Sequence, residues 1–196
     1  MRTADKFTTV RMLFAPLFFI FYRLSGYFTG KNDKAAFWIL VILCVLLVFI
    51  EFTDFLDGFF ARKLGEVSDL GKLYDPFADA LLHITMFFCF ARDGVMPQTA
   101  FVLIFWREYG QIFLRMISIK GGFAVAARKG GKLKTVVYII SGFYALALQI
   151  LEKTSVWQLL PPFLNLLATV LFWVCAALSW ISFIDYLILF HARIKK

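Results

Sequence analysis

Long apolar runs separated by short polar segments dominate the chain. Six runs cover residues 8–28, 35–55, 75–91, 99–119, 135–151 and 163–190. Most approach the roughly 20 residues that a helix needs to cross a bilayer. Turn-forming residues lie between them, at positions 30–33, 93–94 and 161–162. The pattern predicts an all-α, polytopic membrane protein with six transmembrane helices in a single domain spanning residues 1–196.

Composition supports a membrane protein. Of the 196 residues, 61% are hydrophobic, 25 are Phe, and the mean hydropathy is +0.78. A water-soluble fold of this length could not bury so much apolar surface. The three cysteines, Cys44, Cys89 and Cys175, all lie within apolar runs. Their odd number and spacing predict buried thiols rather than disulfides or a metal site.

Basic residues indicate the orientation of the helices. The N-terminus, the second and fourth connections and the C-terminus together carry 14 of the 21 Lys and Arg. Positive charge concentrates on the cytoplasmic side of membrane proteins, which predicts a multi-pass protein of the cell membrane with both termini cytoplasmic. Because the charge lies between apolar runs, topology and anionic headgroups explain the net charge of +8 better than nucleic-acid binding does.

Four aspartates flank the second connection. Asp54 and Asp57 are three residues apart and Asp75 and Asp79 are four apart, so each pair lies on one face of its helix. Small residues occupy neighbouring turns of the same faces: Gly58, Ala61 and Gly71. Oxygen ligands suit Mg²⁺ or Mn²⁺, and two such ions would bind a diphosphate. The segment therefore predicts a two-ion site.

The four aspartates have two other interpretations, as structural residues or as part of a cation transporter. Asp75 before Pro76 fits a helix N-cap, and Asp54 could end a span at the interface. A cation transporter would instead need carboxylates near the bilayer midplane, whereas these lie at the ends of two spans. A functional site explains all four together best. His83, four residues after Asp79, is predicted to be a core histidine with its polar atoms satisfied.

The acidic segment resembles the signature of the CDP-alcohol phosphotransferases. It matches D-x-x-D-G-x-x-A-R-x8-G-x3-D-x3-D at all eight fixed positions, from Asp54 to Asp79. The resemblance implies a six-helix membrane fold, usually dimeric. It also implies transfer of a phosphoryl-linked group from a CDP-alcohol to an acceptor hydroxyl, with release of CMP.

The resemblance also implies roles for individual residues. Asp54, Asp57 and Asp75 would be metal ligands, and Asp79 would be both a ligand and the base that takes the acceptor's proton. The CDP moiety would lie against a further set, which consists of Asp54, Gly58, Ala61, Arg62 and Gly71. The site would face the cytoplasm.

Basic residues later in the chain suggest the acceptor. Arg107 and Arg115 lie eight residues apart in an apolar run, and Lys132 and Lys134 follow. Together they would suit an anionic acceptor phosphate. Topology for the lysines and snorkelling for Arg115 explain the same residues equally well from the sequence alone.

These basic segments are similar to those of bacterial phosphatidylglycerolphosphate synthases. The resemblance covers Arg107-Glu108, Arg115 and the segment 131–135, and it extends to residues 5–11 at the N-terminus. Asp5 and Ala4 depart from the N-terminal pattern, which has Asn and Pro there. The resemblance implies that glycerol 3-phosphate attacks CDP-diacylglycerol. Inositol phosphate, serine or a choline-type substrate remain the alternatives.

Overall fold

Six long helices make up the part of the chain that the structure describes, as the sequence predicted. The computed structural model describes residues 3–64, 71–121, 129–159 and 161–194, and side chains at 8–53, 73–121, 130–159 and 161–193. The helices are α1 (Thr3–Phe28), α2 (Asp33–Leu64), α3 (Gly71–Arg92), α4 (Gln98–Lys120), α5 (Lys129–Glu152) and α6 (Phe163–Ile194), with a 3₁₀ turn, η1 (Ser155–Leu159), before α6. Gly30 and Gly94 adopt positive φ angles of 77° and 78° in the two predicted turns, where glycine meets no steric penalty.

Two helices reach further into the motif than predicted. α2 continues past residue 55 to Leu64, so the first half of the motif is helical. α3 begins at Gly71 rather than at Asp75, and Pro76 lies inside the helix. The interpretation of Asp75 as an N-cap is therefore wrong. Pro76 lies in the second turn of α3, so its missing N–H removes one intrahelical hydrogen bond and its ring crowds the carbonyl one turn earlier, yet the helix extends back to Gly71.

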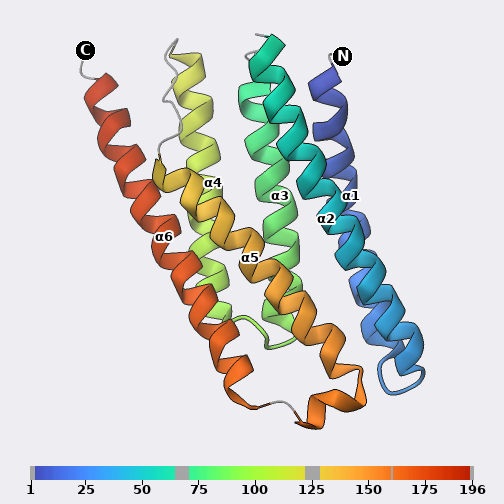
Figure 1. The fold of residues 1–196 in the computed structure, drawn as a ribbon. Helices are drawn as coiled ribbons and strands as arrows, with labels where there is room; N and C mark the ends of the chain where they lie inside the picture. The colour runs from blue at the N-terminus through green and yellow to red at the C-terminus, as the bar shows by residue number, and fades with distance from the viewer. Residues whose placement is uncertain (1–2, 65–70, 122–128, 160, 195–196) are drawn as a thin grey trace.

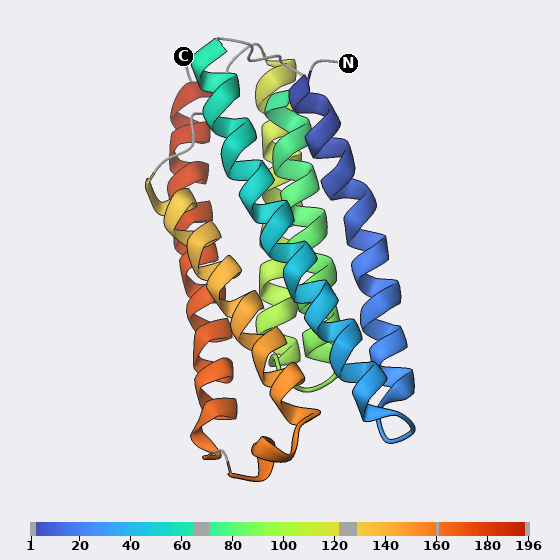
Figure 2. The same cartoon turned by 45° about the vertical axis from the view of Figure 1, so that its right-hand side comes forward.

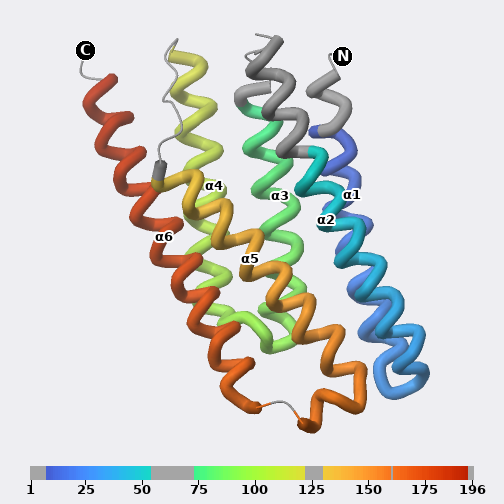
Figure 3. The backbone as a smooth tube through the Cα atoms, viewed as in Figure 1, coloured from blue at the N-terminus to red at the C-terminus, as the bar shows by residue number. Residues whose placement is uncertain are grey.

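Both termini lie at one end of the bundle, which we call the motif end (Figure 1). α2 ends and α3 begins at the same end, and α4 ends there too (Figures 1 and 2). α5 differs from the others. It begins deeper in the bundle than the ends of α4 and α6 and crosses the molecule obliquely, as the backbone tube also shows (Figure 3). The start of α5 is thus recessed from the motif end.

α3 lies at the centre and packs against α1, α4 and α5. Its buried Phe87 makes edge-to-face contacts with Tyr138 of α5 and Phe172 of α6, at ring-centroid distances of 5.1 and 5.4 Å. Such aromatic pairs add to the packing energy of a core. This aromatic group joins three helices, and Tyr138 connects it to the polar residues described below.

The outer surface is apolar, as lipid contact requires. Exposed side chains on α2 include Ile42, Val45 and Phe49, and Trp106 is exposed on α4. Within the described residues, three segments are long and apolar enough to cross a membrane: Asp33–Thr53, Gly130–Glu152 and Phe163–Arg193. The other three helices carry the charged residues of the site within their length, which lowers their hydropathy.

Candidate active site

The second half of the aspartate motif is held by the first helix. Thr8 Oγ1 donates a hydrogen bond to Asp75 Oδ1, and Arg11 Nη1 pairs with Asp79 Oδ1. The hydroxyls of Thr9 and Tyr74 are 3.0 Å apart. Asp75 and Asp79 lie one turn apart on α3, and their partners lie one turn apart on α1. The two helices therefore meet along one polar seam at the motif end.

The Arg11–Asp79 pair is asymmetric in its exposure. The side chain of Arg11 is 5% exposed, whereas that of Asp79 is 39% exposed. A buried guanidinium needs a fixed counter-charge, because an unpaired buried charge is strongly unfavourable. Arg11 thus contacts Asp79 from the protein interior, while the Asp79 side chain stays partly exposed.

The first half of the motif lies on the end of α2. Asp54, Asp57, Gly58, Ala61 and Arg62 belong to this helix, and Gly71 is the first residue of α3. The side chains of these residues lie outside those that the structure describes. Among the described side chains, no three His, Cys, Asp or Glu residues gather closely enough to hold a metal ion. The four-aspartate metal site consequently stays a prediction.

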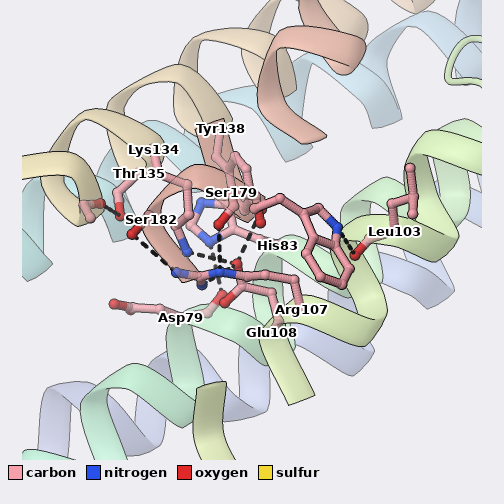
Figure 4. Close-up of polar contacts among 12 residues, drawn as sticks. Asp79, His83, Leu103, Arg107, Glu108, Lys134, Thr135, Tyr138, Ser179 and Ser182 are labelled. Carbon is pink, nitrogen blue, oxygen red and sulfur yellow. Dashed lines mark hydrogen bonds and ion pairs between the residues drawn. The ribbon is translucent and has the colours of Figure 1, made fainter. Parts of the chain in front are cut away.

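A second group of charged residues lies between α4 and α5. We call Arg107, Glu108, Arg115 and Lys134 the basic cluster. Glu108 Oε1 accepts hydrogen bonds from Arg107 Nη1 at 2.9 Å and from Lys134 Nζ at 2.7 Å. The hydroxyl of Tyr138 donates to the same oxygen at 3.1 Å (Figure 4). The structure therefore brings Arg107 and Lys134 together, as the sequence predicted, around a carboxylate.

Arg107 also ties the cluster to α6. Its Nε donates to the backbone oxygen of Ser179 at 3.0 Å, and its Nη2 to Ser182 Oγ at 3.3 Å (Figure 4). A Cβ added at Gly131 would lie 3.8 Å from the same Ser182 Oγ. The start of α5 thus lies against the serine that Arg107 contacts. The guanidinium of Arg107 on α4 thus lies where α5 and α6 pack against each other.

The other two predicted basic residues differ in position. Arg115 lies further along α4, is partly buried, and its Nε has no hydrogen-bond partner among the described residues. It interacts electrostatically with Arg107, Glu108 and Asp79. Lys132 is exposed, and the structure gives it no hydrogen bond or ion pair within the described part of the chain. The structure places Lys132 at the edge of the cluster rather than within it.

Asp79 lies where the acidic and basic groups meet. It interacts electrostatically with Lys134 and Arg115 as well as with Arg11. A carboxylate near a cationic pocket can accept a proton from a group bound in that pocket. The arrangement thus brings carboxylate oxygens and cationic side chains together, which are the kinds of group that a displacement at phosphorus uses.

His83 is buried one turn below Asp79. Its Nδ1 donates to the backbone oxygen of Asp79 at 2.8 Å. Its Nε2 has no hydrogen-bond partner among the described residues and lies 3.9 Å from Glu51 Oε1. The prediction of a core histidine is confirmed, but the prediction that both ring nitrogens would be satisfied is wrong.

Comparison with known proteins decides the family. The family model for CDP-alcohol phosphatidyltransferases matches residues 1–183. The chain belongs to this family. Membership confirms the reaction class that the aspartate motif predicted, and it supports a divalent metal ion as cofactor. It also agrees with the all-helical membrane architecture.

Three curated relatives in the CDP-alcohol phosphatidyltransferase family are similar to this chain over most of its length. A CDP-diacylglycerol–glycerol-3-phosphate 3-phosphatidyltransferase of Treponema pallidum (strain Nichols) is 39% identical over 155 residues, covering 77% of this chain and 71% of the relative. The Bacillus subtilis (strain 168) protein of the same name is 31% identical, covering 70% and 72%. That of Aquifex aeolicus (strain VF5) is 32% identical, covering 72% and 76%.

Sequence reasoning missed several residues that organise the site. Arg11 and Thr8 were noted only as part of an N-terminal resemblance, and Glu108 only as a neighbour of Arg107. Nothing in the sequence distinguished Tyr138 from the many other aromatic residues. A signal existed for Glu108, because an ionisable residue within an apolar helix is costly and usually has a partner and a role. The spacing of Lys134 and Tyr138, one helical turn, also placed both on one face.

Arg11 generates the first prediction. The substitution Arg11→Gln removes the charge that orients Asp79. We expect kcat to fall by about tenfold to a hundredfold, because a small misplacement of a reacting group costs a rate factor of this size. Steady-state assays of CMP release measure this. Arg23→Gln, on the same helix but far from Asp79, is the matched control and should retain activity. Equal loss in both variants would contradict a local role for Arg11.

Proposed function

We propose that the protein transfers the phosphatidyl group of CDP-diacylglycerol to sn-glycerol 3-phosphate, giving phosphatidylglycerol phosphate and CMP in phospholipid biosynthesis. The observation that carries this proposal is the buried basic cluster beside Asp79. The names of the relatives from three bacteria, each a CDP-diacylglycerol–glycerol-3-phosphate 3-phosphatidyltransferase, support the same substrates.

The charge of the basic cluster favours a phosphorylated acceptor. The cluster holds three cations and one carboxylate, a residual charge of +2, while Asp79 is balanced by Arg11. A phosphomonoester carries about −1.5 to −2 charges at neutral pH. It would neutralise the cluster almost fully, whereas inositol, serine or another acceptor without a phosphate would leave buried positive charge unmatched.

The start of α5 adds to this pocket. Its first backbone N–H groups have no intrahelical acceptors, and the helix dipole places partial positive charge at this end. The first turn of α5 lies against Ser182 of α6, because a Cβ added at Gly130 or Gly131 would lie 3.9 or 3.8 Å from that serine. Helix N-termini of this kind favour phosphate. Lys132, exposed on the same turn, would attract the incoming anion.

The acidic half fits a divalent cation. Asp75 and Asp79 present carboxylate oxygens one turn apart, and Asp75 is exposed at the motif end. With Asp54 and Asp57 from α2, they would form an oxygen-only donor set, which suits Mg²⁺ or Mn²⁺ in a two-ion site. When bound, such ions supply charge neutralisation and alignment for the diphosphate. Asp54, Gly58, Ala61, Arg62 and Gly71 would bind the CDP moiety.

Asp79 would act as the base. It would take the proton of the acceptor hydroxyl as that oxygen forms a bond to the phosphorus bearing the diacylglycerol. The phosphorus–oxygen bond to CMP breaks, and CMP leaves with the electron pair. Arg11 would hold the carboxylate in place during this step, and Arg107, Arg115 and Lys134 would hold the acceptor's phosphate.

Location and assembly follow the same proposal. The motif end, with both termini, would face the cytoplasm of the cell membrane, where a soluble acceptor and a lipid donor can both reach the site. The protein would act as a homodimer embedded among membrane lipids. The alternative is another CDP-alcohol phosphotransferase that uses inositol phosphate, serine or a choline-type substrate.

An acceptor screen tests the function. Purified protein with CDP-diacylglycerol and Mg²⁺ or Mn²⁺ is offered glycerol 3-phosphate, inositol phosphate, serine or inositol, and CMP release is followed. We expect glycerol 3-phosphate to give the highest kcat/KM and chelation of the metal to stop the reaction. Preference for another acceptor would overturn the substrate assignment and leave the family intact.

Asp79→Asn tests the base. We expect turnover to be abolished, because a general base contributes about 10²–10⁴-fold and the same carboxylate is a proposed metal ligand. Size-exclusion chromatography and circular dichroism should show a folded protein. Asp93→Asn, in the turn at the opposite end of α3, serves as the matched control and should be active. A near-normal rate for Asp79→Asn would exclude the assignment.

Lys134→Ala tests the acceptor pocket. We expect the KM for glycerol 3-phosphate to rise by about tenfold or more, since a charged hydrogen bond contributes about 1.5–3 kcal/mol, while the KM for CDP-diacylglycerol changes little. Lys132→Ala is the matched control, because its exposed side chain should contribute far less. A larger effect at Lys132 than at Lys134 would contradict the proposed pocket.

A further inference from the structure

Glu108 lies at the centre of the proposed acceptor pocket, although it cannot itself bind an anion. Its residue surface is 5% exposed. One of its oxygens, Oε1, accepts hydrogen bonds from Arg107, Lys134 and Tyr138, at 2.9, 2.7 and 3.1 Å. The three donors come from two helices and converge on a single atom. A carboxylate among phosphate-binding cations weakens their attraction for phosphate, so its presence needs a separate reason.

The contacts of Lys134 supply that reason. Its hydrogen bond to Glu108 is the only one that the structure gives its ammonium group among the described residues, and the side chain is 12% exposed. The ammonium also lies 4.6 Å from the centroid of the Tyr138 ring. A lysine side chain is long and flexible, with four carbons between backbone and charge. Glu108 and the tyrosine ring therefore fix where this charge lies.

Arg107 is fixed differently. Two further hydrogen bonds, to the Ser179 backbone and to Ser182 Oγ, hold its guanidinium against α6. Loss of Glu108 would leave Arg107 with these two contacts but would leave Lys134 with no hydrogen-bond partner in the described part of the chain. The effect of Glu108 on the pocket thus passes mainly through Lys134.

We propose that Glu108 is a positioning residue that sets acceptor specificity: it holds Lys134 in place for the acceptor phosphate and keeps the residual charge of the basic cluster at the +2 that a phosphomonoester dianion neutralises. The inference rests on the proposed function of the site. It differs from a purely structural role, in which Glu108 would only join α4 to α5 and its loss would lower stability and every kinetic constant alike.

Two substitutions separate position from charge. Glu108→Gln keeps the size of the side chain and removes its charge, and Glu108→Asp keeps the charge but withdraws the carboxylate by one methylene. Tyr138→Phe removes one of the three hydrogen bonds and leaves every charge in place. Glu152→Gln, near the other end of α5, is the matched control for loss of a glutamate charge on a helix of the same bundle.

The readouts are the KM values for glycerol 3-phosphate and CDP-diacylglycerol, kcat, and the inhibition constant of inorganic phosphate. We expect Glu108→Gln and Glu108→Asp each to raise the acceptor KM and the phosphate inhibition constant by about tenfold or more, because Lys134 loses its anchor. The KM for CDP-diacylglycerol should stay within about twofold of that of the unsubstituted protein, because these substitutions leave the contacts of the donor unchanged. Tyr138→Phe should raise the acceptor KM by about threefold or less, and Glu152→Gln should match the unsubstituted protein.

Other outcomes overturn the proposal. An unchanged acceptor KM in both Glu108 variants, or a fall in kcat with equal rises in both KM values, would leave Glu108 a structural link only. If Glu108→Asp had the acceptor KM of the unsubstituted protein while Glu108→Gln had a raised one, the charge of residue 108 alone would matter. That result would refute a positioning role for Glu108. If Glu108→Gln does not fold, Glu108→Asp and Tyr138→Phe decide. Failure of the unsubstituted protein to use glycerol 3-phosphate would instead overturn the proposed function.

Discussion

Pairing of charges inside an apolar bundle is the constraint on which the rest of this structure depends. A charged side chain at the centre of a membrane helix costs about 2.5–3.5 kcal/mol on insertion scales, so each must find a partner or a function. Arg11 forms an ion pair with Asp79, and Arg107 and Lys134 form ion pairs with Glu108. These pairs join α1 to α3 and α4 to α5. The contacts that make charge tolerable within the bundle are also those that assemble the site.

The two halves of the site are built on different physical principles. The acidic half lies on the last turns of α2 and the first turns of α3, where we propose that a divalent cation binds. The basic half is buried, because α5 begins inside the bundle and carries Lys134 with it. Asp79 borders both. An acceptor bound by its phosphate in the buried half would have its hydroxyl directed toward the carboxylates.

Much of this could be predicted from the sequence, because helix periodicity and the length of apolar runs are local properties. The six helices, the two turns with glycine and the grouping of Arg107 with Lys134 were predicted. The start of α3 was not, because Asp75-Pro76 is typical of a helix start, whereas α3 begins one turn earlier, at Gly71. The pairing of Arg11 with Asp79 joins positions 68 residues apart, and only tertiary packing brings them together. Glu108 was overlooked because two of its three partners, Lys134 and Tyr138, lie on another helix.

The partnership between the first and third helices has a consequence for biosynthesis. At about 5–20 residues per second, the ribosome needs roughly 3–14 s to extend the chain over the 68 residues from Arg11 to Asp79. During that interval α1 has its arginine without the carboxylate that it finally contacts. The part of α1 that carries Arg11 should therefore remain at the lipid headgroups, where water and phosphates solvate the guanidinium, until α3 arrives. The candidate site then forms late, as α3 with Asp79 packs against α1, the helix that was made first.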